Sequence, residues 1–84
     1  MNTAVGIDVS KGKSAVCAMR PFGEVVLPPR EYAHTPDDLT AMVKSLLLLG
    51  GDARAIMEAT GRYHEPVVSA LRDAGIRVSL ISFT

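Results

Sequence analysis

Hydrophobic residues in this chain gather in short runs that Gly, Pro and small polar residues separate, a pattern typical of strands joined by tight turns. The first two runs cover residues 3–9 and 14–19, and a third begins at residues 24–27. Pro28 and Pro29 interrupt the third run, and because Pro cannot donate to a strand ladder, that strand either ends there or lies at a sheet edge. The first third of the chain therefore predicts a three-strand meander.

The spacing of apolar residues then changes from two to three and four, which predicts an amphipathic helix. Thr35 can cap its start, and Pro36 suits its first position. One apolar stripe runs along it: Leu39, Met42, Val43, Leu46 and Leu47. Gly50 and Gly51 are expected to end the helix.

A strand at residues 53–58, a helix from Arg62 to Ala74 and a last strand at residues 76–83 complete the predicted elements. In the second helix, Tyr63 is expected to pack because it shares a stripe with Val67 and Leu71. The predicted order is β-β-β-α-β-α-β. It indicates an α/β fold in which one mixed sheet carries helices on its faces. Residues 1–84 show no domain boundary and form one small domain or a piece of a larger one.

Composition narrows the class of protein. The chain has 84 residues, of which 48% are hydrophobic and 21% charged, so a disordered chain is excluded. Nine basic and nine acidic residues cancel, which argues against a broad positive field that would hold nucleic acid by itself. The single cysteine, Cys17, excludes a cysteine-cluster zinc site, and we interpret it as a small buried residue. With no recognisable signal peptide and no apolar run that could span a bilayer, we expect a cytoplasmic protein without membrane contact.

Two acidic residues stand near the ends of apolar strands. Asp8 lies near the end of the first strand, which we predict to be buried, and Glu58 ends the fourth. Right-handed crossovers would place these strands side by side and parallel, roughly 4.8 Å apart. Two carboxylates at neighbouring strand ends can bind one cation, or two cations about 3.5–4 Å apart. Because an unpaired buried carboxylate is costly, we predict that Asp8 and Glu58 are catalytic metal ligands.

Structural roles for both acids remain open from the residues alone. Asp8 could accept hydrogen bonds from the backbone amides of Ser10 or Lys11 at the following turn. Glu58 could form an ion pair with Arg62 or accept from the amides of the next helix.

Two other functions also remain open. Thr60 and Gly61 precede a helix and could offer amides to an anion, as in actin-like sugar kinases, although the first turn holds only one glycine, Gly12. Alternatively, the chain could be a non-catalytic assembly module. Its last strand, rich in Val78, Leu80 and Ile81, would lie at a sheet edge and could pair with another copy, which predicts a homo-oligomer.

Two segments of the sequence resemble a known family. The first is Gly6–Lys11, which reads Gly-Ile-Asp-Val-Ser-Lys, and the second is Met57–Gly61, which reads Met-Glu-Ala-Thr-Gly. Together with the helix and strand that follow, they resemble the N-terminal part of DEDD transposases of the insertion-sequence-110 (Piv/MooV-like) family. The resemblance covers essentially all 84 residues. It implies a RuvC-like, ribonuclease H-like fold, with Asp8 and Glu58 as the first two of the four acids for which the family is named.

The resemblance also implies a function and its partners. The intact enzyme is expected to cleave and transfer DNA strands with Mg²⁺ or Mn²⁺, aided by a guide RNA and by a C-terminal domain with a functional serine. In the family, the last two acids belong to a helix beyond the fifth strand. We therefore expect the chain that ends at Thr84 to be a truncated catalytic domain that is inactive alone.

Overall fold

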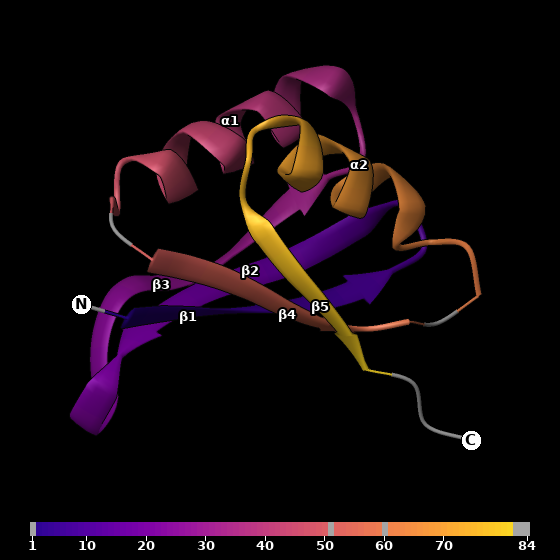
Figure 1. Ribbon diagram of the computed structural model, residues 1–84. Coiled ribbons are helices and arrows are strands. Elements are labelled where there is room, and N and C mark those ends of the chain that lie inside the picture. The colour runs from indigo at the N-terminus through magenta and orange to yellow at the C-terminus, as the bar shows by residue number, and fades with distance from the viewer. Residues whose placement is uncertain (1, 51, 60, 82–84) are drawn as a thin grey trace.

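The computed structural model describes residues 2–50, 52–59 and 61–81 and consists of one sheet with two helices packed on it (Figure 1). The elements follow the predicted order, with a 3₁₀ turn, η1, added between the second and third strands. They are β1 (Asn2–Ser10), β2 (Lys13–Arg20), η1 (Pro21–Gly23), β3 (Glu24–Ala33), α1 (Pro36–Leu47), β4 (Asp52–Glu58), α2 (Glu65–Asp73) and β5 (Arg77–Ile81). None of the helices in the described ranges is long and apolar enough to cross a membrane.

The sheet is mixed, with strand order β3-β2-β1-β4-β5. β1 pairs antiparallel with β2, and β2 pairs antiparallel with β3, so the predicted meander is confirmed. β4 lies beside β1 and parallel to it, and β5 lies parallel to β4. β3 continues through Pro28 and Pro29 at one edge of the sheet, which is the position that the missing amide donors require.

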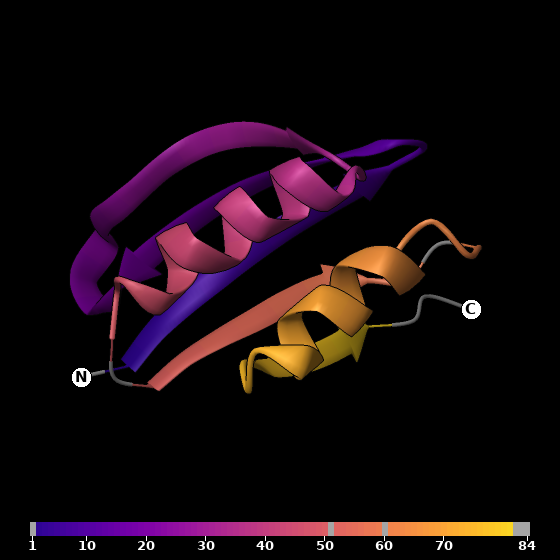
Figure 2. The same cartoon turned by 90° about the horizontal axis from the view of Figure 1, so that it is seen from above.

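Both helices cover the same face of the sheet, which Figure 2 shows from above. The predicted mixed sheet with helices packed on it is confirmed, and in the described residues both helices lie on one face. The reason is the direction of the two crossovers. The chain moves from β3 to β4 and then from β4 to β5 in the same direction across the sheet, so crossovers of one hand put α1 and α2 on one side.

The hydrophobic core fills the space between this face and the two helices. Its largest fully buried side chains are Met42 and Leu46 from α1, Met57 from β4 and Leu71 from α2. The other buried hydrophobic residues are Val5, Ile7, Val16, Ala18, Tyr32, Ala55, Val67, Val68 and Ile76. The opposite face of the sheet, which we call the open face, carries no helix of the described chain.

The start of α1 is held as the sequence predicts. Thr35 is the N-cap, and its Oγ1 accepts a hydrogen bond from the amide of Asp38 at 3.3 Å. The Asp38 carboxylate in turn accepts from the backbone amide of Ala33 at 2.7 Å, which ties the helix to the end of β3. These contacts fix the angle at which α1 returns over the sheet.

The second helix differs from the prediction at its start. α2 begins at Glu65 rather than at Arg62, and Pro66 occupies its first turn. Tyr63 lies in the preceding turn and is 45% exposed, so the expectation that it packs in the core is wrong. The last strand, predicted at residues 76–83, extends to Ile81 in the structure. Ser82 and Phe83 lie outside the described residues.

Candidate active site

Asp8 lies on the open face of β1. Along this strand Thr3, Val5 and Ile7 are buried toward the helices, and the alternation of a strand sends Asp8 to the other side, where it is exposed. The prediction that Asp8 is a buried carboxylate is therefore wrong. The prediction failed because the open-face positions before Asp8 are Ala4 and Gly6. These small residues cannot be told from core residues in the sequence alone.

Glu58 lies on the same face at the end of β4. Ala55 and Met57 are buried toward the helices, and Glu58 is exposed. The β1–β4 pairing runs as far as Ile7 opposite Met57, so Asp8 and Glu58 are the next residues on two neighbouring parallel strands. Carboxyl ends of parallel strands meet at one edge of a sheet, and this is how the fold brings the two acids together.

The two acids line one shallow cavity of about 380 Å³. Its walls come from all five strands and are otherwise apolar or small: Gly6, Ile7, Ala15, Val16, Cys17, Pro29, Ile56, Met57 and Ile81. No basic side chain is among these described lining residues, so both carboxylates face the cavity without a counter-charge. Such a site attracts cations.

The donor set fits half of a magnesium site. Carboxylate oxygens are the ligands that Mg²⁺ and Mn²⁺ prefer, and Mg²⁺ in enzymes is often held by only one or two carboxylates together with substrate phosphates. Among the described residues there is no group of three or more His, Cys, Asp or Glu side chains that could hold a metal ion. Asp8 and Glu58 are thus a pair of ligands and not a closed cage.

The structural roles considered for the two acids find no support in the described contacts. Ser10 uses its hydroxyl to donate to the carbonyl of Lys13 at 3.1 Å, and no hydrogen bond to Asp8 occurs among the described residues. The ion pairs within the described ranges are Lys13–Glu31 and Arg20–Glu24, neither of which involves Glu58.

The backbone just after Glu58 is held by β5. The amide of Ala59 donates to the carbonyl of Ile81 at 2.8 Å, which extends the β4–β5 pairing one residue beyond the strand. Gly61 has a φ of +56°, a conformation that favours glycine, and it starts the turn that leads to α2. Thr60, the other residue of the predicted anion-binding turn, lies outside the described residues.

Sequence reasoning missed several residues of this cavity. Cys17, interpreted as a core residue, is half-buried and lies on the open face beside Gly6. Pro29 and Ile81 reach the cavity from the third and fifth strands. The alternation of faces along a strand could have placed Cys17 on the open face, because Val16 and Ala18 on either side of it belong to the core.

The fold resembles that of solved RuvC and Pelota structures. RuvC from Thermus thermophilus in complex with a Holliday junction substrate aligns with a TM-score of 0.72 at 12% identity, over 98% of this chain and 65% of that one. A second Thermus thermophilus RuvC structure aligns with a TM-score of 0.66 at 13% identity, over 95% and 63% of the two chains. Pelota from Archaeoglobus fulgidus aligns with a TM-score of 0.62 at 12% identity, over 98% of this chain and 26% of that one. The RuvC-like, ribonuclease H-like fold class is thereby confirmed, and the chain spans less than two thirds of the length of each of these proteins.

Sequence comparison identifies the family. A search of curated proteins found no match. A family model described as a transposase matches residues 5–83, which is nearly the whole chain and includes Asp8 and Glu58. The chain belongs to the DEDD transposase family of the insertion-sequence-110 type.

Proposed function

We propose that residues 1–84 are the N-terminal portion of a RuvC-like catalytic domain that cleaves and transfers DNA strands during transposition. In this proposal Asp8 and Glu58 are the first two acids of the catalytic site and hold Mg²⁺ or Mn²⁺. The observation that carries it is their meeting in one cavity, at the carboxyl ends of neighbouring parallel strands. Family membership over residues 5–83 supports the type of reaction.

The chain's own residues contribute position and charge. β1 and β4 hold the two carboxylates at a fixed spacing, because each acid directly follows the last paired residues, Ile7 and Met57. Gly6 and Ala15 keep the cavity wide beside them, and no lysine or arginine lines it within the described chain. When bound there, a divalent ion supplies Lewis-acid stabilisation to a reacting phosphodiester.

The chain alone is predicted not to cut DNA. It carries two of the four acids that the family resemblance implies, and the described residues hold no larger cluster of ligands. Incubation of the purified chain with supercoiled plasmid and 10 mM Mn²⁺ should leave the plasmid uncut. Nicking that disappears in the Asp8→Asn variant would contradict this prediction.

Binding of Mn²⁺ tests the proposed site itself. Electron paramagnetic resonance measures free Mn²⁺ directly, and we expect a site of millimolar affinity in the wild type that is lost in Asp8→Asn and in Glu58→Gln. Asp52→Asn is the matched control, because Asp52 is an exposed acid at the opposite end of β4. Equal binding by all four proteins would show that Asp8 and Glu58 are not the ligands.

The kinase-type alternative makes a different prediction. It requires a turn that cradles phosphates between β1 and β2, and that turn contains a single glycine, Gly12. Calorimetric titration with ATP and Mg²⁺ should show no specific heat of binding for a transposase domain. A saturable heat would favour the alternative.

Partners of the intact protein follow from the same proposal. Double-stranded DNA is the proposed substrate and a guide RNA the proposed second nucleic acid, with the cytoplasm as the location. Self-association is proposed through β5, which forms one edge of the sheet and exposes Leu80 and Ile81 at 41% and 43%.

A further inference from the structure

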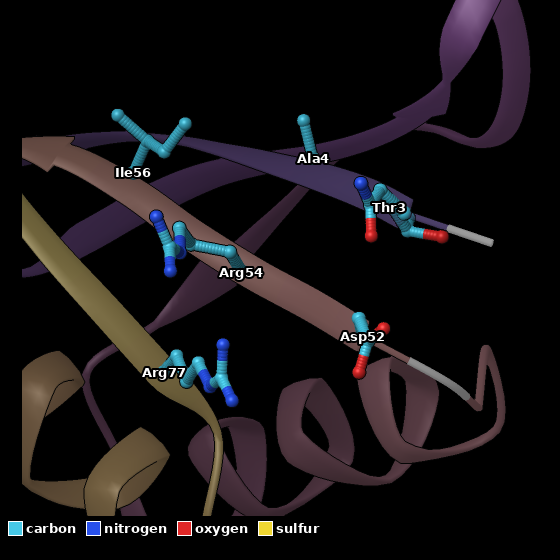
Figure 3. A pocket seen from close by; sticks show the side chains of 7 residues that line it. Thr3, Ala4, Asp52, Arg54, Ile56 and Arg77 are labelled. Carbon is cyan, nitrogen blue, oxygen red and sulfur yellow. The ribbon is translucent and has the colours of Figure 1, made fainter.

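Two arginines form a second charged feature on the open face. Arg54 on β4 and Arg77 on β5 are exposed and are direct partners in the β4–β5 pairing. Figure 3 shows both side chains at one pocket, with Asp52 farther along β4. Because partners on neighbouring strands project to the same face, two positively charged side chains share this part of the open face.

This arrangement is unfavourable unless a negative group is added. Like charges directly opposite each other across a strand pair are destabilising. The ion pairs of the described ranges are Lys13–Glu31 and Arg20–Glu24, so neither arginine has a carboxylate within ion-pair distance there. The pair therefore carries positive charge that the described part of the chain does not neutralise.

The pocket at this pair has the size and polarity for an anion. Its volume is about 450 Å³, and its described lining residues include Asn2 and Thr3 at the start of β1. Asp52 is the one acid among those described lining residues, which leaves two positive charges against one negative. The planar guanidinium of Arg presents a fork of donors that matches the spacing of phosphate oxygens. Arg can therefore bind a phosphate through two parallel hydrogen bonds, whereas Lys acts as a point charge.

The arginine pair and the acid pair share one face of the sheet. Arg54 and Glu58 lie on the same strand four residues apart, so the two features are separated by about 13 Å at the usual rise of a strand. Successive phosphates of one DNA strand wind around the helix as well as advance about 3.4 Å along its axis, so this separation spans roughly two nucleotides.

We propose that Arg54 and Arg77 bind a backbone phosphate of the DNA strand roughly two nucleotides from the phosphodiester that lies at Asp8 and Glu58. This inference rests on the proposed function for the identity of the strand. The arginine pair positions the DNA without reading its sequence, because a contact to phosphate carries no base information.

Fluorescence anisotropy of a labelled duplex tests the inference on the whole chain. The titrations are made without metal between 50 and 200 mM salt, with wild type and the Arg54→Gln/Arg77→Gln double variant. The wild type should bind, and the double variant should bind roughly tenfold more weakly at 50 mM salt. Its plot of log affinity against log salt should be shallower by about one unit, as expected for one lost phosphate contact.

Arg72→Gln is the control for loss of charge, because it removes one positive charge, where the double variant removes two, from α2 on the other side of the sheet. Circular dichroism confirms that each variant is folded. The inference is overturned if the wild type does not bind the duplex, if the double variant keeps the wild-type slope, or if Arg72→Gln weakens binding as much. The Mn²⁺ titration reports separately on Asp8 and Glu58. A normal arginine result with no Mn²⁺ binding would reject the metal site and keep the DNA contact.

Discussion

Replacing Asp8 by Asn should stabilise the metal-free protein, which is the opposite of what a structural carboxylate would do. Asp8 and Glu58 follow the last paired residues of neighbouring strands, which lie about 4.8 Å apart, and both are exposed to water. Two unit charges at this distance repel by at most about 1 kcal/mol in water, and salt screens the repulsion further. The amide of Asn has the same shape as the carboxylate and removes one of the two charges.

The expected effect is measurable because the domain is small. For a chain of this size, 1 kcal/mol shifts the melting temperature by about 4–8 °C, so Asp8→Asn should raise it by at most that amount at low ionic strength. Thermal unfolding followed by circular dichroism in 10 mM buffer with a chelator measures this shift. Asp52→Asn, at the far end of β4, controls for the general loss of a negative charge.

Added metal should reverse the order of stability. With 10 mM Mg²⁺ and a dissociation constant of about 1 mM, binding stabilises the wild type by about 1.4 kcal/mol, while the Asn variant gains little. The wild type should then melt at the higher temperature. A lower melting temperature for Asp8→Asn without metal, unchanged by Mg²⁺, would refute the reasoning. It would mean that the Asp8 carboxylate supports the fold.

Three further outcomes follow from the contacts around the helices and the sheet edge. Thr35→Ala should lower the free energy of unfolding by about 1 kcal/mol in urea titrations, because it removes the cap on the Asp38 amide; Thr35→Ser should restore most of it. Burial lowers the pKa of His34, whose Nε2 lies 2.7 Å from the Ser14 hydroxyl. Below pH of about 6.5 the unfolded chain therefore takes up a proton that the folded chain resists, and stability should fall as the pH drops from 7 to 5.5. His34→Gln should reduce this loss of stability in thermal melts measured across the same pH range. An unchanged dependence of melting temperature on pH would mean that other groups cause the loss. Light scattering at high concentration should give a mass above that of the monomer, and Leu80→Lys on the β5 edge should return it to the monomer; a monomeric wild type would count against self-association.

The order of elements could be predicted because the local signals agree with one another. Thr35 and Pro36 mark the start of α1, and Pro28 and Pro29 restrict β3 to an edge, as the structure confirms. Boundaries were less predictable where two signals compete. Tyr63 continues the apolar stripe of α2, yet Pro66 sets the first turn of the helix later and leaves Tyr63 outside it.

The site could be predicted in its position but not in its surroundings. Asp8 and Glu58 come together because β1 and β4 are parallel neighbours. The preference for right-handed crossovers was enough to predict this pairing from the order of the elements. Exposure of Asp8 depends on which face the helices cover, and small residues such as Gly6 conceal that face in the sequence. The pairing of Arg54 with Arg77 depends on the register of β4 and β5, which no local pattern reports.

The most direct test of the metal site is a crystal of this chain soaked in Mn²⁺, with anomalous density used to locate the ion. We expect a peak between the carboxylates of Asp8 and Glu58, on the open face of the sheet. A peak elsewhere, with the two carboxylates free of metal at saturating Mn²⁺, would contradict it.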